Sequence, residues 1–73
     1  MRLSELKIGE SAVVTAIKLK KKDRERLFSF GIREGVLITV VRKSLFGSPT
    51  LVKISDFFVA LQEKTLFGIE VKR

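Results

Sequence analysis

The sequence predicts a mainly β fold: a small, partly closed barrel of about five short strands, with one short α-helix inserted after the first strand. Short apolar runs rich in β-branched residues alternate along the chain with turn residues. One segment, residues 23–31, instead carries the start and stop signals of a helix. Because the chain has only 73 residues, we expect a single domain, residues 1–73, with a compact core.

The first strand is expected at residues 11–19, after a single helical turn at residues 4–7, where apolar residues recur at near-helical spacing. Both faces of this strand are apolar, so alternation does not show which face is inside. A bulge near Thr15 would allow Val14 and Ile17 to point inward together.

The helix is predicted from its two ends. Asp23 is a helix-capping residue type, and residues 24–30 then supply about two turns. Gly31 ends the helix, since a residue without Cβ adopts the left-handed conformation at little steric cost. Ile32 is expected to fold back onto Leu27, the apolar contact that accompanies such an end.

Three apolar side chains of the helix differ in their expected roles. Leu27 and Phe30 share a face and are predicted to lie in the core. Phe28 lies off that stripe, so it fits either the edge of the core or a contact surface.

The second strand and the loop after it come next. Gly35 allows a tight turn into a strand at residues 36–43, which is apolar on both faces and is therefore expected to be central or bent. The following loop, residues 44–49, contains strong turn residues but also Leu45 and Phe46. Phe46 either folds over the mouth of the barrel or forms part of an exposed patch.

The remaining strands are expected at residues 50–54, 57–61 and 66–71, with turns at residues 55–56 and 62–65. Such short antiparallel strands curl into a partly closed barrel because closure hides strand edges. The predicted architecture is therefore an SH3-like barrel. The residues expected to form its turns and caps are Asp23, Gly31, Gly35, Gly47 and Asp56.

The composition argues against catalysis. The chain has no Cys and no His, so it has no disulfide, no zinc site of the usual kind and no imidazole to activate a serine or threonine. Its eight Asp and Glu residues are scattered, with none at a metal-ligand spacing. We expect a protein that is not an enzyme, without a cofactor and without a tight metal site of its own.

Charge and hydropathy restrict the partners. The formal net charge of +7 favours nucleic acid, an anionic membrane face or an acidic protein surface. The sequence has no apolar stretch long enough to span a bilayer and no secretory signal, so a cytoplasmic location is the default expectation.

Several motifs together resemble one known family. They are Leu3-x-x-Leu6-x-x-Gly9, Arg26-Leu27-x-x-Phe30-Gly31-Ile32-x-x-Gly35-x-x-Ile38-x-Val40, Phe46-Gly47-Ser48-Pro49, and Ala60-Leu61 followed by Ile69-x-Val71. This series, which covers nearly the whole chain, resembles the FeoA family of small cytoplasmic accessory proteins of bacterial ferrous-iron transport.

The resemblance implies an SH3-like barrel that works by binding the cytoplasmic side of the FeoB-type membrane transporter, whose GTP-binding domain drives or gates Fe²⁺ uptake. It implies contact with the membrane only through that transporter. Two positions depart from the family pattern. Asp56 stands where the family commonly has a turn glycine, and Asp tolerates a positive φ better than most residues. Gln62 stands where an arginine is usual, so this chain has no guanidinium at that position.

Two functional hypotheses follow. The first is an interaction module for ferrous-iron transport, with the apolar loop as a possible site of self-association. Its partner-binding residues would be Phe28, Leu45 and Phe46 as apolar contacts, and Lys20, Lys21, Lys22 and Arg24 for steering toward an acidic surface. The lysines also fit a solvated loop without a specific role.

The alternative is an RNA-binding barrel. Residues 35–47 loosely resemble the strand-loop motif of ribosome-associated SH3-like domains. That motif has a glycine where Ser44 stands, and the chain has no Tyr or Trp on which bases could stack. Nucleic acid is therefore the less favoured partner.

Overall fold

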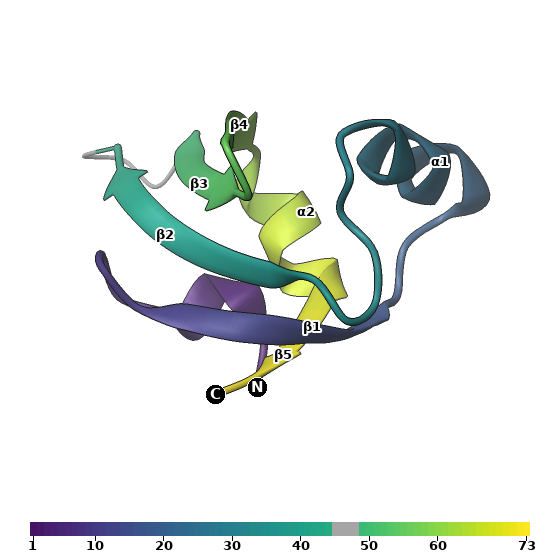
Figure 1. Cartoon of the computed structure of the whole chain (residues 1–73). Coiled ribbons are helices and arrows are strands. Elements are labelled where there is room, and N and C mark those ends of the chain that lie inside the picture. Colours follow the sequence, from purple (N-terminus) through teal and green to yellow (C-terminus); the bar gives the residue numbers. More distant parts are fainter. Residues whose placement is uncertain (45–48) are drawn as a thin grey trace.

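The structure is a computed structural model that describes residues 1–44 and 49–73. Its elements, in chain order, are a 3₁₀ helix η1 (Leu3–Glu5), β1 (Ser11–Ile17), α1 (Lys21–Ser29), β2 (Leu37–Lys43), β3 (Thr50–Ile54), β4 (Phe57–Leu61), α2 (Glu63–Gly68) and β5 (Ile69–Lys72). The strands form one antiparallel sheet in the order β4-β3-β2-β1-β5 (Figure 1). The predicted mainly β fold, with a helix after the first strand and β2 central, is confirmed.

The core lies on one side of this bent sheet and is closed at one end by η1 and α2, which pack together (Figure 1). Leu3 and Leu66 are the side chains that these two short helices bury. The buried apolar residues are Leu3, Leu6, Ala12, Val14, Ile17, Leu27, Ile32, Ile38, Val40, Val52, Ile54, Leu61, Leu66, Ile69 and Val71. Together they form one contiguous cluster.

The bulge expected in the first strand is present. The register with β5 shifts between Val14 and Ala16, which leaves Thr15 as the extra residue. As a result Val14 and Ile17 are both buried, although they would lie on opposite faces of a regular strand. The bulge is therefore the reason that strict alternation fails to identify the inner face.

The prediction that Asp23 caps the helix is wrong. The capping position belongs to Lys20, whose backbone is extended and whose C=O accepts the Arg24 N–H at 2.9 Å. Lysine is a good helix former, so Lys21 and Lys22 extend the helix backwards instead of forming a loop. Asp23 lies in the first turn, where its carboxylate still stabilises the positive end of the helix dipole.

The end of α1 follows the prediction. Gly31 is in the left-handed region, with φ of +88°. Its N–H bonds to Phe28 O at 2.9 Å and the Ile32 N–H bonds to Leu27 O at 2.9 Å, the paired bonds of a Schellman motif. Phe30, expected in the core, is instead 37% exposed, because it stands at the C-cap and the helix buries only Leu27.

The turn at Gly35 and the turn between β3 and β4 were also predicted. Gly35 has φ of +91°, and its N–H bonds to Val14 O at 2.8 Å, which ties the turn to β1. The predicted turn at residues 55–56 is present, but its residue with positive φ is Ser55, at 55°, and not Asp56. In a two-residue hairpin turn the first residue can carry the positive φ alone. Gly47 lies outside the described residues.

The predicted turn at residues 62–65 and strand from residue 66 are also wrong, since α2 occupies residues 63–68. The chain must travel from β4 at one edge of the sheet to β5 at the other, and the helix spans that distance while burying Leu66. A six-residue helix with one buried side chain has too little periodicity to be recognised in the sequence. It ends at Gly68, which lies against Leu19 and whose C=O accepts the Lys18 N–H at 2.6 Å.

Candidate functional site

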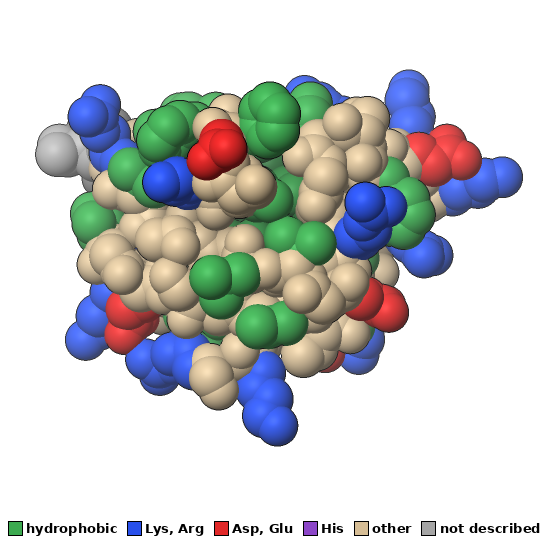
Figure 2. Space-filling view, viewed as in Figure 1, with side chains coloured by type: hydrophobic (Ala, Val, Ile, Leu, Met, Phe, Trp, Pro, Cys, Tyr) green, Lys and Arg blue, Asp and Glu red, His purple; other side chains and the backbone are tan. Residues whose placement is uncertain are grey.

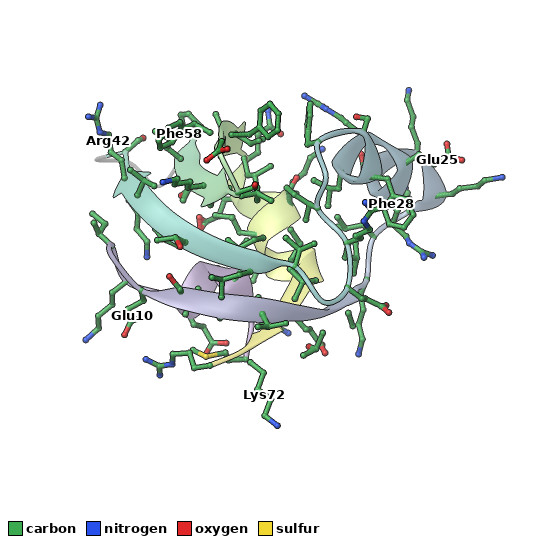
Figure 3. All side chains as sticks on the ribbon, in the orientation of Figure 1. Glu10, Glu25, Phe28, Arg42, Phe58 and Lys72 are labelled. Atoms are coloured by element: carbon green, nitrogen blue, oxygen red, sulfur yellow. The ribbon has the colours of Figure 1, made fainter. Side chains whose placement is uncertain are left out.

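Exposed apolar side chains gather where the C-terminal end of α1 faces β4 and the start of β2. Figure 2 shows hydrophobic side chains at the surface in this region, and Figure 3 labels Phe28 on α1 and Phe58 on the β3–β4 side. We call this surface the aromatic face. It consists of Phe28, Phe30, Leu37, Phe57 and Phe58.

Two open grooves make this face concave. The first is lined by residues 28–31 of the α1 end and residues 57–60 of β4. The second continues from it along the start of β2 to the β3–β4 turn, and the two share Phe30, Gly31 and Phe57. A partner segment could therefore contact both regions at once.

The exposure of β4 is unusual for a strand. Phe57 is 68% exposed and Phe58 is 58% exposed, although neighbouring residues of a strand point to opposite faces. The first half of β4 therefore projects beyond the core, and only Leu61 at its end is buried. Clustered exposed phenylalanines of this kind indicate an interaction surface.

A cation lies beside each of two rings of the aromatic face. The Lys53 ammonium lies 5.8 Å from the centre of the Phe58 ring, and the Arg26 guanidinium lies 6.0 Å from that of Phe30. Both distances fall in the range of cation–π contacts. The face therefore combines apolar area with a positive rim.

The structure brings three of the predicted partner-binding residues together. Lys21, Arg24 and Phe28 recur at helical spacing on one side of α1 and line a shallow groove with Glu25. Lys20 and Lys22 are exposed but do not line that groove. The other two, Leu45 and Phe46, lie outside the described residues, and so does the apolar loop suggested for self-association.

Sequence reasoning missed four residues of the face: Phe30, Leu37, Phe57 and Phe58. One signal was available for the last two. Two consecutive phenylalanines in a strand point to opposite faces, so a sheet with one core-facing side must expose one of them. That Phe57 is also exposed depends on the projection of β4, which sequence does not reveal.

Two ion pairs are seen in residues 1–44 and 49–73. Arg73 bonds to Glu10 at 2.7 Å, and Lys18 approaches Glu70 at 3.2 Å. The backbone N–H of Lys7 donates to Glu10 at 2.8 Å and is the main cause that lowers the pKa of Glu10, assisted by Arg73. These pairs involve the β1–β5 side, so they leave the cations of α1 and β3 available to a partner.

Within the described part of the chain, no three Asp or Glu residues lie close enough together to hold a metal ion. None of the helices described is long and apolar enough to cross a membrane.

Five short antiparallel strands around one core, with a helix after the first strand, define a small SH3-like domain. The model of the FeoA domain matches residues 1–73. The chain therefore belongs to the FeoA family of non-enzymatic accessory domains.

Individual relatives agree with this assignment. The chain is 35% identical over 72 residues to the Fe(2+) transport protein A/Fe(2+) transporter FeoB fusion protein of Porphyromonas gingivalis, a match that covers 99% of this chain and 8% of the fusion protein. It is similar to the FeoA protein of Chlorobium tepidum, with 32% identity and a TM-score of 0.92 over 97% of this chain and 68% of that one. It is also similar to the FeoA of Stenotrophomonas maltophilia, a procaryotic SH3 domain protein solved with zinc, with 32% identity and a TM-score of 0.82 over 99% and 89% of the two chains.

Proposed function

We propose that this protein is a cytoplasmic accessory protein of bacterial ferrous-iron transport, and that it acts by binding the cytoplasmic side of a FeoB-type transporter through the aromatic face. The observation that carries the proposal is the exposed cluster of four phenylalanines and Leu37 in a domain whose relative in P. gingivalis is fused to FeoB. Fusion of two proteins in one chain supports a physical association between their unfused counterparts.

The energetics of the face suit a reversible complex. Burying a fully exposed Phe side chain contributes on the order of 1.5–3 kcal/mol, and the phenylalanines of the face are between 37% and 68% exposed. A few such side chains in a concave surface are typical of the residues that dominate binding energy. The cations beside them, Arg26 and Lys53, would increase the association rate with an acidic partner surface.

The test measures the affinity of the protein for the full-length FeoB-type transporter of the same bacterium, solubilised in detergent. We expect Phe57→Ala and Phe58→Ala each to weaken binding about tenfold or more, because each removes exposed ring area from the groove. Phe67→Ala is the matched control: Phe67 is 53% exposed but lies on α2, outside the face. Its affinity should stay within about twofold of the parent.

Equal losses in all three variants would show that the aromatic face has no special role. Absence of binding by the parent protein would contradict the proposed function itself. If the protein instead bound structured RNA with an affinity that fell steeply with salt, the alternative of an RNA-binding barrel would replace it.

A further inference from the structure

The two outer edges of the sheet are treated differently. At the β5 edge, the N-terminal residues cover the strand: Val71 donates its N–H to Met1 O at 2.7 Å, and Arg2 forms a β-bridge with Glu70. The Met1 amine also donates to Val71 O at 3.2 Å. At the β4 edge, no backbone bond from residues 57–60 to any described residue other than those of β3 is found.

The register shows which groups of β4 are unpaired. The two-residue turn closes on the Ile54–Phe57 pair, and such a closing pair exchanges both backbone bonds. Because bonded and non-bonded pairs alternate, Phe57, Val59 and Leu61 bond to β3, whereas Phe58 and Ala60 direct their N–H and C=O groups away from the sheet.

Among the residues that the structure describes, nothing gives this edge the protection that exposed edges have in natural proteins. Such edges carry charged side chains, proline, or a covering segment. The sequence of β4 is Phe-Phe-Val-Ala-Leu, which has neither charge nor proline. Beside it runs the first groove of the aromatic face, with the end of α1 as its other wall. An unprotected apolar edge that opens into a groove is a template for another strand.

We propose that an extended, acidic segment of the transporter adds to the sheet as a strand along the free edge of β4, in the groove between β4 and α1. This inference depends on the proposed function and specifies its mode of binding. Phe58 and Ala60 would provide the backbone bonds, and the rings of the aromatic face would contact the side chains of the added strand.

The charged side chains beside the groove favour an acidic strand as its occupant. Lys53 lies beside Phe58 at one side of the groove. At the end of β4, the pocket beside Ala60 is lined by two cations, Arg26 and Lys64, and by one acidic residue, Asp23. Carboxylates on an added strand would pair with these cations. A second copy of this chain carries a net charge of +7, so its approach to the same edge is opposed by repulsion. The positive rim therefore favours an acidic partner over self-association.

The first experiment removes one outward N–H. In Ala60→Pro the outward donor is lost, while the bonds to β3 use other residues; Ala60→Ser keeps the donor and is the matched control. With the full-length transporter we expect Ala60→Pro to weaken binding about tenfold or more and Ala60→Ser to stay within about twofold. Thermal unfolding and the amide NMR spectrum of each variant establish that it is folded.

The second experiment needs no variant. Hydrogen–deuterium exchange of the parent protein, read on fragments that cover residues 57–61, should slow when the transporter binds, because Phe58 and Ala60 acquire partners. The Lys64→Glu variant should bind more weakly, and its deficit should shrink at high salt.

The outcomes separate this inference from the proposed function. Binding that depends on Phe57 and Phe58, with unchanged exchange in residues 57–61 and a normal affinity for a folded Ala60→Pro variant, would overturn strand addition and leave the proposed function intact. Absence of binding by the parent protein would overturn both. Protection of residues 57–61 in the protein alone, together with a dimer in sedimentation, would show that a second copy is the occupant and would overturn the inference.

Discussion

Replacing Gly31 by alanine should lower the free energy of unfolding by about 1–2 kcal/mol, the cost of placing an L-residue with Cβ in the left-handed region. At this position the cost of backbone strain can be measured without any steric clash. Gly31 has φ of +88°, and a Cβ built there would have no atom within 4 Å beyond its chain neighbours. The variant therefore introduces backbone strain without a clash.

The assay is thermal or urea unfolding followed by circular dichroism. For a domain of 60–100 residues, 1 kcal/mol corresponds to a shift in Tm of about 4–8 °C, so we expect Gly31→Ala to lower Tm by about 4–16 °C. Gly31→Asn is the matched comparison, because asparagine visits the left-handed region more readily, and it should lose less stability than alanine.

Equal stability of Gly31→Ala and the parent would refute the reasoning, since the helix would then end without a left-handed residue. A larger loss in Gly31→Asn than in Gly31→Ala would also contradict it, because side-chain size rather than backbone conformation would be limiting.

Three further predictions concern other parts of the fold. Gly68→Ala should lower the free energy of unfolding by about 1–3 kcal/mol, because a Cβ at this position would lie 2.7 Å from Leu19 Cγ. In a chain that also carries Leu19→Ala, the same change at Gly68 should lower it by less. Leu27→Ala should cost about 2–5 kcal/mol in the same assay, since Leu27 is the one side chain that α1 buries. The lowered pKa of Glu10 contributes stability that is fully present above the usual pKa of 4.5 and is lost as pH falls through the lowered pKa of the folded state. The stability of Glu10→Gln should therefore fall less than that of the parent between neutral and acidic pH. Identical profiles of stability against pH would contradict this.

Local signals in the sequence predicted much of the fold. The left-handed glycines at positions 31 and 35 were predictable because no other residue type adopts that conformation so readily. The bounds of β3 and β4 were predicted to the residue, because both strands are flanked by residues that favour turns. The bulge in β1 followed from the need to bury Val14 and Ile17 together.

Other features of the fold depend on contacts between residues that are far apart in the chain. The N-cap of α1 is Lys20 and not Asp23 because capping and helix propensity each contribute only about 1 kcal/mol or less, and the tertiary context decides between them. The helix α2 forms because the chain must connect opposite edges of the sheet, a requirement that appears only when the strand order is known.

The candidate site shows the same division. The sequence by itself determined the residue chemistry: no Cys or His, an excess of positive charge, and phenylalanines in number. Only the tertiary structure decided that Phe28, Phe30, Leu37, Phe57 and Phe58 are exposed beside two adjoining grooves, and that the described residues leave the β4 edge unpaired whereas the N-terminal residues cover the β5 edge. The physical reason is that exposure depends on which elements pack across the sheet, and contacts between residues far apart in the chain set that packing.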